Sequence, residues 1–368
     1  MNALYIGLMS GTSMDGIDAV LCRFESGHFA GVVAHHASAY EPALRQQLLD
    51  LQKHAHSIAL RQYADLDARI ADAFADTAND LLKHSSRAPA QIAAIGSHGQ
   101  TIFHDPHGAR SSLQLGDPNR IAARTGVATV ADFRRKDIAL GGQGAPLVPA
   151  FHQALFADAN EARAVLNLGG IANLTLLPAD GAPVRGFDTG PGNGLMDEWA
   201  QRHLNQPFDS DGAFAASGSP HAALLESLLS DPYFHLAPPK STGRGQFHLD
   251  WISARYPAYA SLPPADVQCT LAELTARSIC DTLRLHAPNT QRLLVCGGGV
   301  RNGFLMQRLR AFVGIPVEAT DTHGLDAQSV EAAAFAWLAM RSVNRWSGNL
   351  PAVTGASREA ILGGIFYP

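Results

Sequence analysis

The chain has 368 residues, of which 46% are hydrophobic and 17% charged, so it can bury a large core and long disordered stretches are excluded. A chain of this length is expected to form two domains. The formal net charge of −5 argues against a nucleic-acid-binding protein, and the densest basic cluster is only residues 134–136.

The cysteines and the N-terminus indicate where the protein works. The cysteines stand at Cys22, Cys269, Cys280 and Cys296, without a CxxC pair or the spacing of zinc ligands, as in proteins of a reducing compartment. Residues 1–5 do not open a signal peptide, and no apolar stretch approaches the ~20 residues that span a bilayer. We therefore expect a soluble, cytoplasmic protein.

Two segments share one pattern, in which an apolar strand, a turn of small polar residues and a second apolar strand follow one another. The first is residues 4–22, with its turn at 10–16, and the second is residues 164–177, with its turn at 169–173. The likeness suggests two related halves, offset by roughly half of the chain.

Helices are predicted between these strands. Residues 61–84 carry apolar side chains at steps of three and four, which is typical of an amphipathic helix. Thr270 and Glu273 form a capping-box pattern that predicts a helix start, and an alanine-rich helix is predicted from about Gln328. Strands that alternate with helices, together with hairpins, indicate an α/β protein with mixed sheets.

Two stretches rich in Gly, Pro, Ser and Asp lie in the second half of the chain, at residues 207–220 and 231–247. We expect long surface loops there, which either close over a cleft or serve as plain connections.

Three glycine-rich turns are candidates for binding phosphate and nucleotide. Backbone N–H groups in a tight turn can hold a phosphate where the chain approaches closely, which favours glycine and hydroxyl residues. Neither a Walker loop nor a GxGxxG between a strand and a helix is present. The turns are residues 10–16, 169–173 and 297–302. Together they predict a nucleotide held between two lobes.

Asp188 is the candidate catalytic residue. It follows a predicted strand and is succeeded by Thr189 and three glycines, which would let substrate and nucleotide approach a general base. The alternative is an Asx-turn or a helix N-cap. Asp188, Thr189 and Gly190 also spell the aspartic-peptidase triplet, but that chemistry needs two carboxylates and the chain has no second triplet, so a peptidase would require a dimer.

Polar residues after two other predicted strands are candidates for binding substrate. Their uncharged donors and acceptors suit sugar hydroxyls and amides, and a guanidinium can pair with a carboxylate. For His98, a hydrogen-bonded histidine at a strand end is an equally open interpretation. The candidates are His98, Gln100, Thr101, Asp132, Arg134 and, at a predicted helix start, Glu331.

These segments, in this order and over essentially the whole chain, resemble the anhydro-N-acetylmuramic acid kinase family. The first and fifth of them are the most specific, and the loop at 207–247 is the part that matches least. The segments are residues 7–18 (GLMSGTSMDGID), 97–101 (SHGQT), 132–149 (DFRRKDIALGGQGAPLVP), 166–174 (LNLGGIANL), 186–194 (GFDTGPGNG) and 297–302 (GGGVRN).

The resemblance implies the two-lobed, actin-like ATPase fold, a duplicated ribonuclease-H-like α/β fold with an interlobe cleft, found in the sugar kinase/Hsp70/actin superfamily. We expect lobe I at residues 1–130, with a C-terminal tail, about 352–368, that could return to it. Lobe II is expected at residues 131–351.

The resemblance also implies a reaction, in which 1,6-anhydro-N-acetylmuramic acid, ATP and water give N-acetylmuramic acid 6-phosphate and ADP during cell-wall recycling. Asp188 would be the base, and Arg134 would meet the lactyl carboxylate. Mg²⁺ would keep several waters, so no protein metal site is predicted. The predicted nucleotide-binding residues are Gly11, Thr12, Ser13, Met14, Asp15, Gly16, Ile17, Asp18, Gly169, Gly170, Asn173, Gly297, Gly298 and Gly299.

Three other functions are open to the same fold. They are an actin- or Hsp70-like ATPase, a kinase acting on an ordinary sugar, and a sugar sensor without catalysis. The expected partners are small molecules only, with no nucleic acid and no membrane, and a homodimer stays open.

Overall fold

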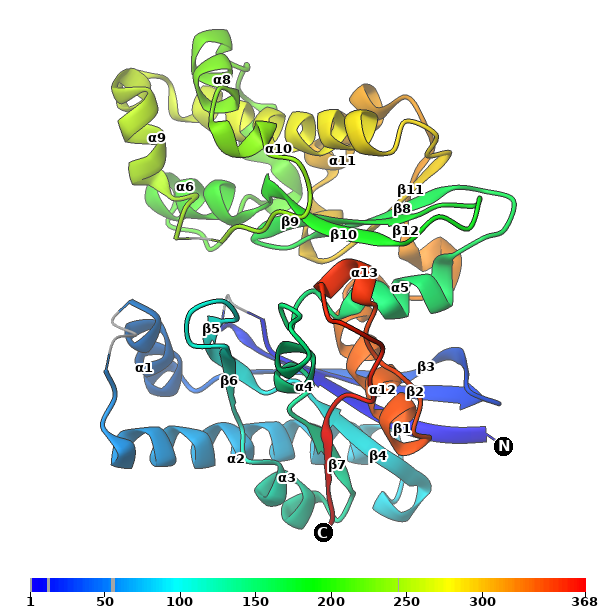
Figure 1. The fold of residues 1–368 in the computed structure, drawn as a ribbon. Helices are drawn as coiled ribbons and strands as arrows, with labels where there is room; N and C mark the ends of the chain where they lie inside the picture. The colour runs from blue at the N-terminus through cyan, green and yellow to red at the C-terminus, as the bar shows by residue number, and fades with distance from the viewer. Residues whose placement is uncertain (1, 12–13, 54–56, 244) are drawn as a thin grey trace. The chain divides into compact units, whose positions relative to one another are not determined.

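The computed structural model describes residues 2–11, 14–53, 57–243 and 245–368. Contacts divide the chain into two compact units, each with its own mixed sheet and helices (Figure 1). Unit 1 consists of residues 1–155 and 329–368, and unit 2 consists of residues 156–328.

The sheet of unit 1 has the strand order β13-β7-β4-β1-β2-β3. Strands β1, β4 and β7 are parallel, whereas β2, β3 and β13 each run antiparallel to their neighbour. A separate hairpin pairs β5 with β6. The strands are β1 (Asn2–Met9), β2 (Gly16–Glu25), β3 (His28–Ala39), β4 (Ile92–Ser97), β5 (Gln100–Asp105), β6 (Ser111–Leu115), β7 (Thr129–Ala131) and β13 (Gly364–Phe366).

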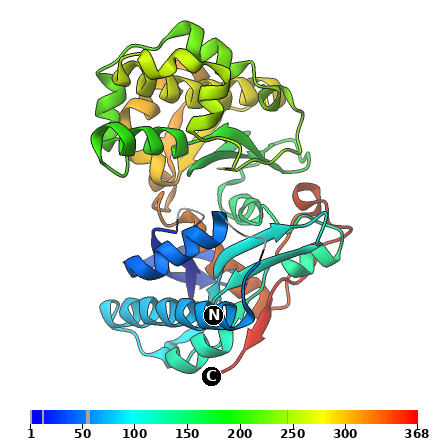
Figure 2. The ribbon, with the colours of Figure 1, turned by 90° about the vertical axis from the view of Figure 1, so that its left-hand side faces the viewer.

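Helices α2 and α12 cover opposite faces of this sheet. Side chains alternate along a strand, so Ile6 and Leu8 join a core with α2 while Gly7, between them, faces α12. Figure 2 shows α2 as the long blue helix of unit 1. The helices of unit 1 are α1 (Pro42–Lys53), α2 (Leu60–His84), α3 (Pro118–Thr125), α4 (Arg135–Ala139), α5 (Val148–Phe156), α12 (Val330–Val343), α13 (Pro351–Thr354) and the 3₁₀-helix η1 (Pro89–Gln91).

The sheet of unit 2 has the order β10-β9-β8-β11-β12. Its first three strands in the chain form an antiparallel meander, and β11 and β12 continue parallel to β8. Unit 1 arranges β3-β2-β1-β4-β7 in the same way, which confirms the prediction of two related halves. The strands are β8 (Arg163–Leu168), β9 (Ile171–Leu177), β10 (Arg185–Pro191), β11 (Arg292–Cys296) and β12 (Val317–Ala319).

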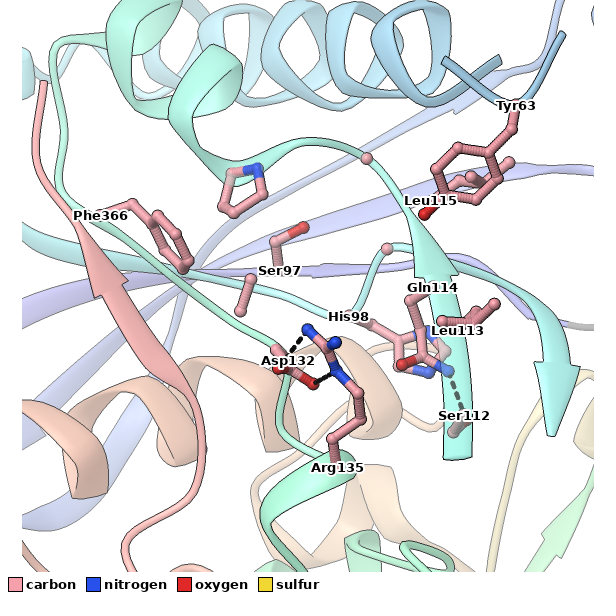
Figure 3. A pocket seen from close by; sticks show the side chains of 14 residues that line it. Tyr63, Ser97, His98, Ser112, Leu113, Gln114, Leu115, Asp132, Arg135 and Phe366 are labelled. Carbon is pink, nitrogen blue, oxygen red and sulfur yellow. Dashed lines mark hydrogen bonds and ion pairs between the residues drawn. The ribbon is translucent and has the colours of Figure 1, made fainter. Parts of the chain in front are cut away.

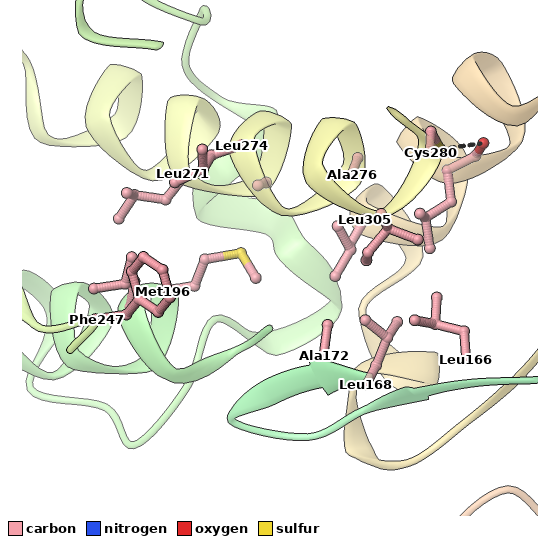
Figure 4. Close-up of a cluster of buried hydrophobic side chains, with 14 of the residues drawn as sticks. Leu166, Leu168, Ala172, Met196, Phe247, Leu271, Leu274, Ala276, Cys280 and Leu305 are labelled. Carbon is pink, nitrogen blue, oxygen red and sulfur yellow. Dashed lines mark hydrogen bonds between the residues drawn. The ribbon is translucent and has the colours of Figure 1, made fainter. Parts of the chain in front are cut away.

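The core of unit 2 lies beneath α10, where Leu271, Leu274 and Ala276 are buried over Leu168 and Ala172 of the sheet (Figure 4). The helices are α6 (Gly194–Leu204), α7 (Ala213–Ala216), α8 (Ala222–Leu229), α9 (Leu249–Arg255), α10 (Pro264–His286) and α11 (Gly303–Val313), with the 3₁₀-helices η2 (Ser210–Gly212), η3 (Pro232–His235), η4 (Pro257–Ser261), η5 (Gly298–Arg301) and η6 (Thr320–His323).

The predicted helix start at Thr270 is wrong, because α10 begins at Pro264 and Thr270 is fully buried inside it. The Thr270 hydroxyl donates to the carbonyl oxygen of Asp266, and Glu273 pairs with Arg308 at 2.8 Å. A proline at the first helical position needs no capping hydroxyl, and this signal overrides the capping-box pattern.

The unit boundaries at 155/156 and 328/329 differ from the expected lobe boundaries at 130/131 and 351/352. Residues 131–155 and 329–351 belong to unit 1, because α12 packs on β1 and β4. The tail reaches unit 1 as well, since β13 pairs with β7. All four cysteines are buried, and no described helix is long and apolar enough to span a membrane.

Glycines let α12 approach the sheet of unit 1. A Cβ atom at Gly7 would lie 1.8 Å from the carbonyl oxygen of Ala332, and one at Gly96 would lie 2.0 Å from that of Phe335. Real Cβ atoms do not come so close to a backbone oxygen, so β1 and β4 need glycine where α12 crosses them.

We expect Gly96→Ala to destabilise the protein by about 2 kcal/mol or more, because α12 must shift to relieve the overlap. The urea midpoint of unfolding, followed by circular dichroism, measures this. Gly243→Ala is the matched control, since nothing lies within 4 Å of a Cβ atom at that position. Equal midpoints for the two variants would contradict the close packing of α12.

Candidate functional site

Asp188 lies on β10 in unit 2, opposite Asn173 of β9. Its backbone N–H donates to the carbonyl oxygen of Lys240 at 3.1 Å, and its Oδ2 atom accepts from the backbone N–H of Thr242 at 2.9 Å. Burial raises the pKa of the Asp188 carboxyl to about 6, whereas the Thr242 N–H and the Lys240 charge oppose that rise. A carboxyl with such a pKa can be ionised near neutral pH and still accept a proton.

The second glycine turn lies against the turn that follows Asp188. The N–H of Gly192 donates to Gly170 at 3.0 Å, and the N–H of Asn193 donates to Gly169 at 2.8 Å. A Cβ atom at Gly192 would lie 2.4 Å from the carbonyl oxygen of Gly169, so only glycine allows this approach. The two turns, far apart in the sequence, therefore form one backbone-lined surface.

The third turn joins the same surface. Gly297 has φ +85°, and a Cβ atom there would lie 2.4 Å from Asn167 Oδ1. A Cβ atom at Gly299 would lie 2.6 Å from that of Leu168, and the Asn193 side chain donates to the Leu168 carbonyl oxygen at 3.0 Å. Unit 2 thus brings three of the predicted segments together: residues 169–173, 186–194 and 297–302.

This surface fits a nucleotide. Asn167 Oδ1 is buried and has no hydrogen-bond partner among the described residues, so it could accept from a ribose hydroxyl or an exocyclic amine. Gly298 is exposed, and nothing lies within 4 Å of a Cβ atom there. Among the described residues, no group of three or more His, Cys, Asp or Glu side chains could hold a metal ion.

The predicted phosphate turn at 10–18 lies in unit 1, between β1 and β2, and Thr12 and Ser13 fall outside the described residues. Met14 and Ile17 are buried in the core. Asp15 and Asp18 form exposed ion pairs with Arg45 and His35. Side chains at 14 to 18 are thus occupied elsewhere, and the backbone, with Gly11 and Gly16, is the part of this turn that could meet a phosphate.

The buried side chain of Gln100 holds this turn in place through hydrogen bonds. It is fully buried, and its Oε1 atom lies 2.7 Å from the Ser10 hydroxyl and 3.3 Å from that of Tyr40. Its Nε2 atom donates to the Gly11 carbonyl oxygen at 3.2 Å. A side chain with its donors and acceptors so engaged holds the turn in place and is not presented to a substrate.

His98 and Arg134 form a buried pair in unit 1. Arg134 donates to His98 Nε2 at 2.8 Å, so that nitrogen is unprotonated and Nδ1–H points to the Ser10 carbonyl oxygen, 3.2 Å away. Burial and the Arg134 charge hold the pKa of His98 well below its ordinary value. Burial lowers the pKa of Arg134 to about 10, and the nearby Glu331 carboxylate opposes this. Three predicted substrate residues therefore lie together.

A pocket of about 180 Å³ lies beside them at the ends of β4 and β7 (Figure 3). Asp132, in the left-handed backbone region at φ +62°, pairs with Arg135 at 2.6 Å on its wall. His98 also lines the pocket, whereas Thr101 lies on β5, where its hydroxyl accepts from Gln114 at 3.1 Å.

Sequence reasoning missed Asp137, which secures the segment that carries Arg134. This carboxylate is fully buried and accepts from the Gly144 N–H at 2.8 Å, the Asn349 amide at 2.7 Å and the Thr354 hydroxyl at 2.8 Å. Asp137 follows other charged residues in a short helix, so nothing in the sequence predicts that it is buried.

Sequence reasoning expects a surface loop at residues 231–247 that closes over a cleft or serves as a connection, but it does not name the residues of this loop that contact Asp188. Tyr233 donates to the Asp188 carbonyl oxygen at 3.0 Å, in addition to the contacts of Lys240 and Thr242. A lysine followed by Ser, Thr and Gly was the one available signal, since these residue types form anion-binding turns.

The fold is that of the actin-like ATPases and sugar kinases. Component A of the (R)-2-hydroxyglutaryl-CoA dehydratase of Acidaminococcus fermentans shares the fold, with a TM-score of 0.50 at 11% identity over 93% of this chain and 99% of its own.

The chain belongs to the anhydro-N-acetylmuramic acid kinase family, whose model matches residues 3–368. The anhydro-N-acetylmuramic acid kinase of Xanthomonas axonopodis pv. citri is 55% identical over 99% of this chain and 98% of its own length. That of Shewanella halifaxensis is 51% identical over 100% and 99%. The predicted resemblance is confirmed.

We expect Asp137→Ala to destabilise the protein by about 3 kcal/mol, because three buried donors lose their acceptor. Chemical unfolding measures the loss. Asp65→Ala is the control, since Asp65 is 64% exposed and pairs only with Arg69 at 3.6 Å, and such surface pairs contribute about 0–1 kcal/mol. A small effect at Asp137, equal to that of the control, would contradict the bracing role.

Proposed function

We propose that this chain is an ATP-dependent anhydro-N-acetylmuramic acid kinase. It opens the 1,6-anhydro ring of the sugar with water and transfers the γ-phosphoryl group of ATP to O6, so that N-acetylmuramic acid 6-phosphate and ADP are formed. Relatives of full length carry this kinase name at 51% to 55% identity, which does not favour the ATPase and ordinary-sugar alternatives. The observation that carries the chemistry is the partly buried Asp188 carboxyl, on the strand that leads into the turn bonded to Gly169 and Gly170.

Asp188 acts as the base in this proposal. It takes a proton from the water whose oxygen forms the new bond to C1, while the bond between C1 and O6 breaks. O6 forms a bond to the γ-phosphorus of ATP while the bond from that phosphorus to the bridging oxygen of ADP breaks and ADP leaves. The phosphoryl group thus caps the leaving oxygen as the proton of a general acid does in ordinary glycosidases. One carboxylate is therefore sufficient.

Backbone groups of the glycine turns are the proposed nucleotide-binding groups of each unit. In unit 2 these are Gly169, Gly170, Gly297, Gly298 and Gly299, with Asn173 on β9 beside Asp188. In unit 1 they are the turn from Gly11 to Asp18. Mg²⁺ bound with the phosphates would neutralise their charge and keep several waters, so few protein ligands are needed.

The sugar would be recognised by the cluster of unit 1. Arg134 has a charged guanidinium beside Glu331, and a lactyl carboxylate could pair with it. His98, kept neutral, and Thr101 and Asp132 offer uncharged and charged groups for hydroxyls and the N-acetyl amide.

The product of this reaction is a phosphorylated amino sugar that a bacterium can return to metabolism. We therefore assign the protein to carbohydrate metabolism and cell-wall recycling, as a transferase of the cytoplasm where ATP is available.

Mass spectrometry of the products tests the function. Protein, Mg²⁺, ATP and 1,6-anhydro-N-acetylmuramic acid in ¹⁸O-labelled water should give N-acetylmuramic acid 6-phosphate with one labelled oxygen, at C1. Labelled inorganic phosphate and an unchanged sugar would instead indicate an ATPase, and phosphorylation of glucose or N-acetylglucosamine at an equal rate would indicate an ordinary sugar kinase.

We expect Asp188→Asn to lower kcat by about 10²–10⁴-fold, because the amide cannot accept the proton of the water. The affinity for ATP, measured by calorimetry, should stay within about threefold of wild type, since the turns bind through the backbone. A variant that keeps more than about a tenth of kcat, a difference under ~1.4 kcal/mol, would exclude Asp188 as the base.

The pH profile of the wild-type enzyme should follow the ionisation of Asp188. The reaction needs the carboxylate, so kcat/KM should fall tenfold per unit as the pH drops below the raised pKa of about 6. An acid limb near the ordinary pKa of an aspartate, about 4, would show that another group governs activity.

A further inference from the structure

The segment of residues 231–247 is anchored at its start by one carboxylate. Asp231 is buried and accepts from the Tyr233 N–H at 2.8 Å and from the Trp251 indole at 2.7 Å. Arg255 pairs with it at 2.6 Å. These bonds join the start of the segment to α9.

Aromatic rings of the same segment pack against β10. Phe234 and Phe247 stack with their ring centroids 5.7 Å apart. The Phe234 ring lies 2.7 Å from the place where a Cβ atom of Gly190 would be, and Gly190 has φ +146°. Position 190 therefore requires glycine for two reasons, the positive φ and the approach of the Phe234 ring. The segment packs closely against β10 at this point.

From this position the segment holds Asp188 on several sides. The Asp188 N–H donates to the carbonyl oxygen of Lys240, and the Asp188 carbonyl oxygen accepts from the Tyr233 hydroxyl. The Oδ2 atom of Asp188 accepts from the Thr242 N–H at 2.9 Å. The Oδ1 atom accepts no hydrogen bond from a described residue. One oxygen is fixed and the other is left for a water molecule.

Lys240 adds a buried charge. It is only 8% exposed, its Nζ atom donates to the Tyr233 carbonyl oxygen at 3.2 Å, and it lies 4.7 Å from the centre of the Tyr233 ring. Burial lowers the pKa of the Lys240 amine, and the Asp188 charge opposes this. Burying an ammonium group is costly unless an opposite charge compensates for it.

We propose that Lys240 and the main chain of Thr242 position Asp188 and hold its carboxylate in the charged form, ready to accept the proton of the attacking water. This inference rests on the proposed function and names two positioning residues for it. Neither is a catalytic residue, because each acts through Asp188.

Few other titratable groups surround this end of β10. Tyr233, from η3, has its pKa raised by burial and then by the Asp188 charge, so it stays neutral. His286, at the end of α10, packs edge-on against Phe187, and its carbonyl oxygen accepts from Arg185. Burial, Arg185 and Lys240 all hold the pKa of His286 low, so its ring stays neutral at neutral pH. Among the residues that the structure describes, Lys240 is thus the cation whose charge acts on Asp188.

The test is the pH profile of kcat/KM in Lys240→Gln, which removes the charge and keeps a donor for the Tyr233 carbonyl. The pKa of Asp188 should rise when the cation is lost, so the acid limb should move upward by about one pH unit. At a pH well below the pKa of Asp188, the variant should have a kcat/KM about tenfold lower than wild type, whereas its KM for ATP should stay near the wild-type value. Lys240→Arg keeps the charge and should return the limb to the wild-type position.

A control variant on another part of the chain separates this role from a general loss of charge. Lys83→Met removes the same charge from an exposed pair with Asp80 on α2 and should leave the profile unchanged.

An unmoved acid limb in Lys240→Gln overturns the inference, as does a loss confined to the KM for ATP, which would make Lys240 a nucleotide ligand. If the glutamine variant does not fold, Lys240→Arg decides, and a limb displaced by about one pH unit despite the retained charge overturns the inference. A wild-type protein that does not turn over the anhydro sugar refutes the proposed function itself, before any variant is made.

Discussion

The site in unit 2 depends on one contact, the approach of two backbones at Gly170 and Gly192. Their hydrogen bonds join the turn after β8 to the turn after Asp188, and no side chain could be accommodated between them. This approach fixes the end of the strand that carries Asp188 against the second glycine turn. A backbone-lined surface of this kind binds phosphates through N–H groups and needs little side-chain chemistry. The few side chains that remain can then serve the reacting sugar and water.

Buried polar side chains give unit 1 its own rigidity. Gln100 ties the first turn to the strand end, and Asp137 ties the segment of Arg134 to the C-terminal residues. Burial of these groups is costly unless each donor and acceptor is used, and here nearly all are. The same environment keeps His98 neutral and Arg134 close to it. Polar side chains that the sequence suggests as substrate ligands are thus of two kinds. Some form hydrogen bonds that stabilise the site, and others are available to bind a substrate.

Much of this could be read from the sequence, because it depends on local patterns. The periodicity of 61–84 predicted α2 within one residue, and the paired strand–turn–strand segments predicted the repeated sheet. Predictions that depend on distant partners fared less well. The start of α10 was misplaced. The contacts of segment 231–247 with Asp188 were not predicted, because its glycines and prolines mark turns and say nothing of what packs on them.

The sequence by itself determined the α/β class, the glycine turns, the candidate base Asp188 and the family to which the chain belongs, since each resides in residues that are neighbours along the chain. Only the tertiary structure decided which turns contact one another, which polar side chains are buried, and that Lys240 and Thr242 form hydrogen bonds with Asp188. The reason is that hydrogen bonding and desolvation act between atoms brought together by folding, over separations of 22 residues from Gly170 to Gly192 and 52 residues from Asp188 to Lys240.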